Sequence, residues 1–185
     1  MELFVACSSS DKISNRYLEA CREYLSELFD NDNNLVFGAS SKGLMGLSYR
    51  LSKEKGKNVT GICPVAYKDD LRDLDCENTI LTKSISERTD ELIAKSDAII
   101  FLPGGIGTIY EFFASLESKR CGEFDKPMII YNACGYFDKM FEFLDVLYQE
   151  EFSSSKIKNC YYFSNSADDT LNYIKNYKKD QEYNN

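Results

Sequence analysis

The sequence alternates between two hydrophobic patterns. Short runs of consecutive apolar residues are typical of strands buried in a sheet, whereas apolar residues three or four positions apart form one face of a helix. The stretch 14–29 shows the second pattern, with one helical stripe formed by Tyr17, Leu18, Cys21, Tyr24, Leu25 and Leu28. The short runs predict strands at 2–7, 34–39, 58–63, 78–83, 97–102, 126–132 and 159–164. The periodic stretches predict helices at 14–29, 43–56, 84–96, 108–121, 136–151 and 167–177.

Strands and helices alternate along the whole chain. This order predicts an α/β fold with a Rossmann-like, doubly wound parallel sheet of about six or seven strands and helices on both faces. The polar stretch 67–78 interrupts the alternation and is a candidate loop or lid. Because no repeat or linker divides the chain, we expect a single Rossmann-like domain at 1–178 and a frayed polar tail at 179–185. Ligands of such sheets bind beyond the carboxyl ends of the strands.

The composition is that of an ordinary globular protein, with 43% hydrophobic and 28% charged residues in a chain of 185. No apolar run approaches the roughly 20 residues that span a membrane. The N-terminal stretch MELFVACSSS lacks the basic start and long apolar run of a signal peptide. We therefore expect a cytoplasmic protein without a membrane partner. The net charge of −8 argues against a nucleic-acid partner, which would require clustered Lys and Arg.

The chain has no histidine and seven cysteines. Without histidine there can be no Ser-His or Cys-His couple and no HExxH zinc site, so a general acid or base must be a carboxylate, Tyr, Lys or Cys. The cysteines form no CxxC pair, which is typical of reduced thiols and disfavours an all-cysteine zinc site. Cys7, at a predicted strand end, is an alternative nucleophile, although no histidine could activate it. We expect no metal and no organic cofactor.

A glycine-rich turn, PGGIGT, follows the predicted strand at 97–102. Glycines allow a tight turn and a close approach to a ligand, and the start of the next helix favours an anion such as phosphate. The backbone N–H groups available to that anion are those of Gly104, Gly105, Ile106, Gly107 and Thr108. The turn is neither a Walker A loop nor a complete dinucleotide fingerprint. The alternative is a tight strand-to-helix connection that binds nothing.

Arg88 and Glu111 are the candidate catalytic residues. Glu111 lies one helical turn beyond the predicted anion site, where the sugar of a nucleotide would lie. The alternative is a capping box, in which Thr108 begins the helix and Glu111 bonds back to its amide. Arg88 falls on the apolar stripe of the helix at 84–96, so we expect it to be buried beside an anion. That anion is a ligand phosphate, Glu111 or a structural carboxylate.

These residues belong to two segments that together resemble a known pair of motifs. SERT (86–89) followed by DAIIFLPGGIGTIYE (97–111) resembles the HERK-type and PGGxGTxxE motifs of the LOG family. Its members are cytokinin riboside 5′-monophosphate phosphoribohydrolases, often mislabelled as lysine decarboxylases. The resemblance implies that Arg88 and Glu111 are the catalytic arginine and glutamate, and that the glycine turn binds phosphate.

The resemblance extends outward, over about residues 2–150. VACSSS (5–10) is similar to the family's CGSS strand end, and GASSKGLMG (38–46) to its GGGxxGLMG segment. This implies further substrate contacts at Ser8, Ser9, Gly43, Met45 and Gly46. The departures from the family pattern surround the expected base and phosphate pockets, and they are Ser8, Ala39, Ser40, Ser86, Thr89 and Tyr110.

The family resemblance implies a homodimer with shared active sites. It also implies hydrolysis of the N-glycosidic bond of a nucleoside 5′-monophosphate, to free base and ribose 5-phosphate. A carboxylate beneath the sugar would stabilise an oxocarbenium-like ribose during that reaction. One alternative is a nucleotide-binding or cofactor-carrier protein without turnover, and another is base exchange between nucleosides. Lysine decarboxylation is disfavoured because the sequence has no convincing pyridoxal phosphate site.

Overall fold

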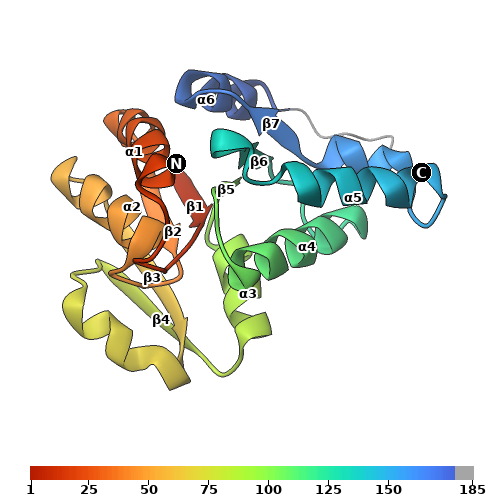
Figure 1. Ribbon diagram of the computed structural model, residues 1–185. Coiled ribbons are helices and arrows are strands. Elements are labelled where there is room, and N and C mark those ends of the chain that lie inside the picture. Colours follow the sequence, from red (N-terminus) through yellow and green to blue (C-terminus); the bar gives the residue numbers. More distant parts are fainter. Residues whose placement is uncertain (178–185) are drawn as a thin grey trace.

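Seven parallel strands form a single sheet in the computed structural model, which describes residues 1–177 (Figure 1). The predicted tail at 179–185 lies outside the described residues. Neighbouring strands follow the order β4-β3-β2-β1-β5-β6-β7, and each neighbouring pair is parallel. The predicted fold class is therefore confirmed. The strands are β1 (Glu2–Ala6), β2 (Asn34–Phe37), β3 (Val59–Pro64), β4 (Asn78–Thr82), β5 (Ala98–Phe101), β6 (Met128–Tyr131) and β7 (Tyr162–Ser164).

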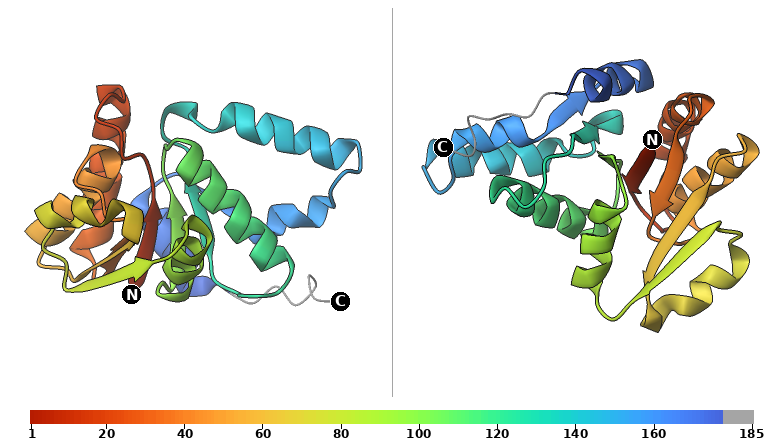
Figure 2. Two further views of the ribbon diagram at one scale, coloured as in Figure 1. Left: turned by 90° about the horizontal axis from the view of Figure 1, so that it is seen from below. Right: turned by 180° about the vertical axis from the view of Figure 1, so that it is seen from behind.

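Helices cover both faces of the sheet (Figure 2). They are α1 (Asn15–Asp30), α2 (Gly43–Glu54), α3 (Ile85–Ala94), α4 (Ile106–Arg120), α5 (Asp138–Gln149) and α6 (Ala167–Asn176). Helices α1, α2 and α6 pack with side chains such as Leu3 and Phe37 in one hydrophobic core. Helices α3, α4 and α5 pack with Phe4 and Phe101 in the other core, because successive strand residues point to opposite faces.

The sequence pattern located the elements but missed some of their ends. The polar stretch at 67–78 overlaps a 3₁₀ segment, η1 (Val65–Asp73). The predicted helix at 136–151 corresponds to α5 (Asp138–Gln149), which is shorter at both ends, and the 3₁₀ segment η2 (Ala133–Gly135) precedes it. The first part of the predicted strand at 159–164 belongs to η3 (Ser155–Cys160). There Ile157 and Cys160 are buried at the spacing of one 3₁₀ turn, and this packing overrides the strand-like pattern.

The chain reverses its direction across the sheet at β1. From β1 it builds β2, β3 and β4 toward one edge, then crosses to the other side of β1 to form β5, β6 and β7. A reversal of this kind opens a crevice beyond the carboxyl ends of the central strands, where α/β proteins bind ligands. Within the described residues, no helix has the length and apolar composition needed to cross a membrane.

Candidate active site

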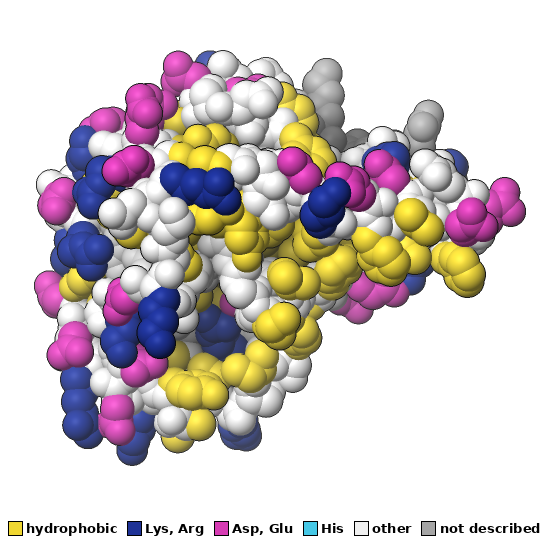
Figure 3. All heavy atoms as spheres, viewed as in Figure 1, with side chains coloured by type: hydrophobic (Ala, Val, Ile, Leu, Met, Phe, Trp, Pro, Cys, Tyr) yellow, Lys and Arg dark blue, Asp and Glu magenta, His cyan; other side chains and the backbone are white. Residues whose placement is uncertain are grey.

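A cleft of about 500 Å³ lies beyond the carboxyl ends of the central strands. The space-filling view shows it as a hollow with basic atoms in its depth and hydrophobic side chains on its rim (Figure 3). Most of the residues expected at the site line it together, namely Ser8, Ser9, Met45, Arg88, Gly105, Ile106, Gly107, Thr108 and Glu111. The fold therefore brings together residues that are as far as a hundred positions apart in the sequence.

Arg88 and Glu111 form a buried ion pair in this cleft. Arg88 Nη1 lies 2.8 Å from Glu111 Oε1, and Arg88 Nε donates to the Ile62 carbonyl oxygen at 3.1 Å. The two residues are 9% and 2% exposed. Helix α3 delivers the arginine and helix α4 the glutamate. Of the alternatives for the partner of Arg88, the structure therefore selects Glu111.

The two carboxylate oxygens of Glu111 have different surroundings. Its Oε2 is buried and has no hydrogen-bond partner among the residues that the structure describes. Burial raises the pKa of this carboxyl above its ordinary value, while the charge and hydrogen bond of Arg88 act in the opposite direction. An orphaned buried carboxylate oxygen is costly for the folded protein, and such costs are typical of functional sites.

The capping-box alternative is wrong. Helix α4 begins at Ile106, two residues before the predicted start at Thr108, and its N-cap is Gly105, which makes no side-chain capping hydrogen bond. Glu111 consequently lies in the second turn and pairs with Arg88. The Thr108 side chain is buried against the turn, where a Cβ on Gly104 would come within 2.0 Å of Thr108 Oγ1. Glycine at 104 is therefore required for Thr108 to pack.

The glycine turn presents an open helix end to the cleft. The first N–H groups of any α-helix have no intrahelical partner and attract anions. A Cβ at Gly105 or Gly107 would meet nothing within 4 Å, so the space outside these two residues is free. Gly104 faces a smaller hollow of about 270 Å³ on the other side of the turn. Its carbonyl oxygen accepts a hydrogen bond from Tyr136 Oη at 2.6 Å, which fixes the turn.

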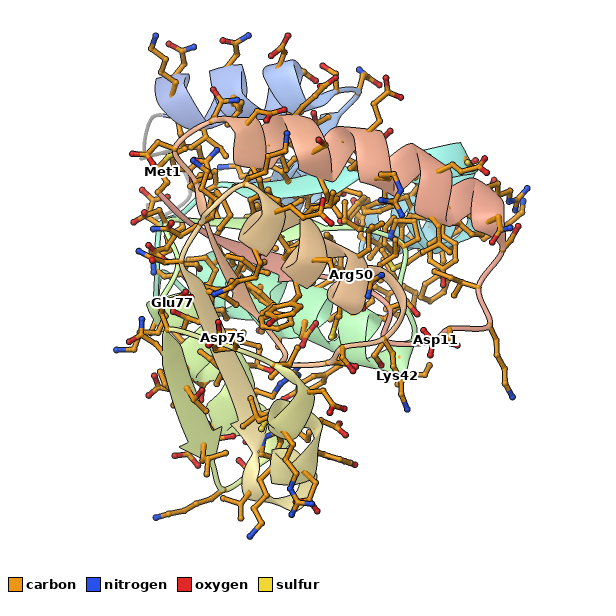
Figure 4. All side chains as sticks on the ribbon, turned by 90° about the vertical axis from the view of Figure 1, so that its left-hand side faces the viewer. Met1, Asp11, Lys42, Arg50, Asp75 and Glu77 are labelled. Carbon is orange, nitrogen blue, oxygen red and sulfur yellow. The ribbon has the colours of Figure 1, made fainter. Side chains whose placement is uncertain are left out.

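Gly43 and Gly46 do not line the cleft, although the resemblance implied substrate contacts there. Gly43 has a φ of +57°, and a Cβ on it would lie 2.7 Å from the Ser8 carbonyl oxygen. A Cβ on Gly46 would lie 2.0 Å from the Ser41 carbonyl oxygen. Both glycines thus let α2 approach the neighbouring loops closely, and Gly43 N donates to Asp11 Oδ1 at 2.8 Å. Figure 4 shows Asp11 beside Lys42, the residue that precedes α2.

Gly38, the residue that follows β2, was not among the predicted site residues. A Cβ on Gly38 would lie 1.6 Å from Arg88 Nη2 and 2.8 Å from Arg88 Cζ. The guanidinium therefore occupies the space that any other residue at this position would fill. The next residue, Ala39, has a φ of +57° in the left-handed region, which costs on the order of 1 kcal/mol for a non-glycine residue. A glycine at the end of a strand was the available sequence signal.

Tyr67, Asp70 and Ile85 also line the cleft and were missed. Tyr67 and Asp70 belong to η1, within the polar stretch that the sequence marked only as a candidate loop or lid. Ile85 begins α3, one turn before Arg88. Nothing in the hydrophobic pattern showed that η1 folds back over the strand ends.

Two thiols border the cleft, those of Cys7 and Cys63. Burial raises the pKa of both, so they are held in the protonated form. This weakens the alternative in which Cys7 is a nucleophile. Among the described residues, no group of three or more Cys, Asp and Glu side chains is placed to hold a metal ion.

The fold and the site define a Rossmann-like α/β protein with a nucleotide-sized cleft and a buried arginine–glutamate pair. The family model described as "Possible lysine decarboxylase" matches residues 45–174. A cytokinin riboside 5′-monophosphate phosphoribohydrolase of Arabidopsis thaliana is 30% identical over 176 residues, which cover 94% of this chain and 81% of the relative. The chain therefore belongs to this family, and the resemblance to LOG proteins is confirmed.

A second relative comes from Oryza sativa subsp. japonica and is named a probable cytokinin riboside 5′-monophosphate phosphoribohydrolase. It is 32% identical over 158 residues, 84% of this chain but 62% of the relative, so the chain spans less than two thirds of that protein. Solved structures are also similar. A molybdenum cofactor carrier protein of Chlamydomonas reinhardtii has a TM-score of 0.68 and 18% identity, over 94% of this chain and 95% of the other.

The molybdenum cofactor binding protein of Rippkaea orientalis has a TM-score of 0.67 and 21% identity over 94% of each chain. At these identities the two likenesses establish a common fold and nothing about ligands.

Proposed function

We propose that the protein hydrolyses the N-glycosidic bond of a nucleoside 5′-monophosphate, releasing the free base and ribose 5-phosphate. The observation that carries this proposal is the buried Glu111 carboxylate, which has one oxygen held by Arg88 and the other unpartnered among the described residues. It lies in a cleft that also contains the open N-terminus of α4. A carboxylate near an anion-binding helix N-terminus suits a substrate in which a phosphate is attached to the reacting sugar.

Each part of the site then has a role. The amide groups at the start of α4 bind the phosphate. As the bond between C1′ and the base nitrogen breaks, positive charge develops on the ribose, and the Glu111 carboxylate stabilises it. Water adds a hydroxyl group to C1′, and its remaining proton goes to the nitrogen of the departing base. Arg88 is the positioning residue that keeps Glu111 ionised and oriented.

The relatives support this reaction class because both are named as phosphoribohydrolases of cytokinin riboside monophosphates. A cytokinin riboside monophosphate is accordingly one of the candidate substrates. The resemblance to carrier proteins is one of fold, so a carrier without turnover remains an outcome of the test rather than a second proposal.

We also propose a homodimer in the cytoplasm. Exposed hydrophobic side chains run along α4 and α5 and the segment after them, at Phe113, Phe143, Val146 and Phe152 (Figure 3). Such a surface favours a protein partner, and the resemblance names a second copy. All seven cysteines are free thiols, as in a reducing compartment. Light scattering should give twice the monomer mass, and a monomer at micromolar concentration would contradict the dimer.

The test of function is a panel of nucleoside 5′-monophosphates that includes a cytokinin riboside monophosphate. Purified protein is incubated with each, with and without a second free base as acceptor, and products are separated by chromatography. We expect free base and ribose 5-phosphate in equal amounts, independent of the acceptor. A new nucleotide that forms only with the acceptor would indicate base exchange. Tight binding without any product would indicate a carrier.

A further inference from the structure

The cleft has two ends with different chemistry. It runs across the adjacent strands β5, β1, β2 and β3, which at a spacing of about 4.8 Å span roughly 14 Å. Helix α4 follows β5, and its N-terminus is the proposed phosphate-binding site at one end of the cleft. Cys63 and Pro64, the last residues of β3, lie at the other end. The ion pair lies between, since Arg88 contacts the Ile62 carbonyl oxygen on β3 and Glu111 on α4. A nucleotide with its phosphate on α4 therefore has its base at the β3 end.

The β3 end offers apolar faces. The residues that follow β3 fold into η1, and Tyr67 from η1 lines the cleft with 57% of its surface exposed. Ile85, at the start of α3, lines the same end and is 45% exposed. Large exposed apolar side chains at the mouth of a cleft suit a flat aromatic ligand, which an aromatic ring can stack on.

The same end carries one carboxylate without a partner. Asp70 lines the cleft and makes no hydrogen bond or ion pair within the part of the chain that the structure describes. Its neighbour Asp69 differs in two ways. Asp69 Oδ1 forms an ion pair with Arg72 Nη2 at 2.8 Å, and Asp69 is not among the residues that line the cleft. Arg88, the basic residue in the cleft lining among those described, is already engaged by Glu111.

We propose that Asp70 selects bases that carry an exocyclic amino group, such as adenine and cytosine, over their oxo counterparts hypoxanthine and uracil. An ionised carboxylate has acceptors only, so it binds an N–H of the base and repels a carbonyl oxygen at the same position. An N-substituted adenine still has one such N–H. This specificity rests on the proposed function, since it places the base by the position of the phosphate and the sugar.

The test compares substrate pairs that differ only in that group. The kcat/KM ratios of adenosine over inosine 5′-monophosphate, and of cytidine over uridine 5′-monophosphate, are measured for the wild type, Asp70→Asn and Asp69→Asn. The wild type should favour the amino-bearing member by up to about tenfold, because a hydrogen bond to a charged group is weakened by water at the exposed Asp70. Asp70→Asn should abolish or invert both ratios, because the amide can donate to a carbonyl oxygen. Asp69→Asn is the matched control and should leave the ratios unchanged.

The outcomes separate this inference from the proposed function. Cleavage of both members at equal rates by the wild type, or equal changes in the two variants, would overturn the role of Asp70 and leave the reaction intact. If no nucleotide is cleaved, calorimetry with adenosine and inosine monophosphates decides. A preference for the amino-bearing nucleotide that Asp70→Asn removes supports the inference without the reaction, and no preference overturns it.

Discussion

The position of Arg88 depends on the absence of a side chain at Gly38, and this gives a sharp test of the site. Gly38→Ala would put a Cβ 1.6 Å from Arg88 Nη2. A carbon and a nitrogen in contact lie about 3.5 Å apart, so the guanidinium must move by nearly 2 Å. The backbone of Gly38 is outside the left-handed region, and the nearest atom that does not belong to Arg88, Met45 Cε, would lie at 3.3 Å. Displacement of Arg88 is therefore the main effect of this substitution.

The size of the effect follows from the contacts that are lost. A shift of this length breaks the 2.8 Å bond to Glu111 Oε1 and the 3.1 Å bond to the Ile62 carbonyl oxygen. The bond to Glu111 is the one that orients the carboxylate, and a hydrogen bond to a charged group contributes about 1.5–3 kcal/mol, so its loss alone corresponds to a fall in kcat/KM of roughly 10- to 150-fold. The displaced guanidinium can reach water in the cleft, so the protein should still fold.

A double-mutant cycle measures this effect directly. Initial rates of base release are compared for the wild type, Gly38→Ala, Arg88→Ala and the double variant, with circular dichroism to verify folding. If the methyl group acts through Arg88, Gly38→Ala should have almost no effect once Arg88 is alanine. An equal loss in both backgrounds, or full activity of Gly38→Ala, would show that the methyl group does not act through Arg88.

Three further predictions concern the same site. Because burial raises the pKa of Glu111, the acid limb of the kcat/KM profile should lie above pH 4.5. Arg88 lowers the same pKa, so Arg88→Ala should move the acid limb to higher pH, and a limb that stays in place would contradict this. A carboxyl whose pKa is raised on folding stabilises the protein below its unfolded pKa and loses that contribution as pH rises through its folded pKa. The free energy of unfolding of Glu111→Gln, measured in urea, should therefore rise relative to that of the wild type as the pH increases above 4.5. A difference between the two proteins that stays constant with pH would count against a raised pKa. Tyr136→Phe removes the hydrogen bond to the Gly104 carbonyl oxygen, so the free energy of unfolding should fall by about 1 kcal/mol. The KM should rise with little change in kcat, and an unchanged KM would show that this hydrogen bond does not position the glycine turn.

Local patterns in the sequence carried most of the fold. Apolar runs such as 97–102 and the stripe at 14–29 are set by burial on the sheet, and burial is what hydrophobic periodicity reports. The predicted ends of helices and strands were wrong where tertiary contacts determine them. The start of α4 is set by the extended backbone of Gly105, whereas the sequence favoured Thr108 as a capping residue.

The candidate site was predictable where a local sequence pattern by itself indicates the position of a residue. Arg88 was expected inside because it lies on an apolar helical stripe, and the structure pairs it with Glu111. Gly38 and Asp70 could not be placed in this way. Their places in the cleft depend on how the segment after β2, η1 and α3 are arranged around it, which no local pattern encodes.

The most direct test of the account is the release of free base from a nucleoside 5′-monophosphate by the wild type and by Glu111→Gln, side by side and equally folded. We expect hydrolysis by the wild type and a loss of about 100-fold or more in the variant, because the amide cannot stabilise the positive ribose. Equal base release by the two proteins would contradict the central role given to Glu111.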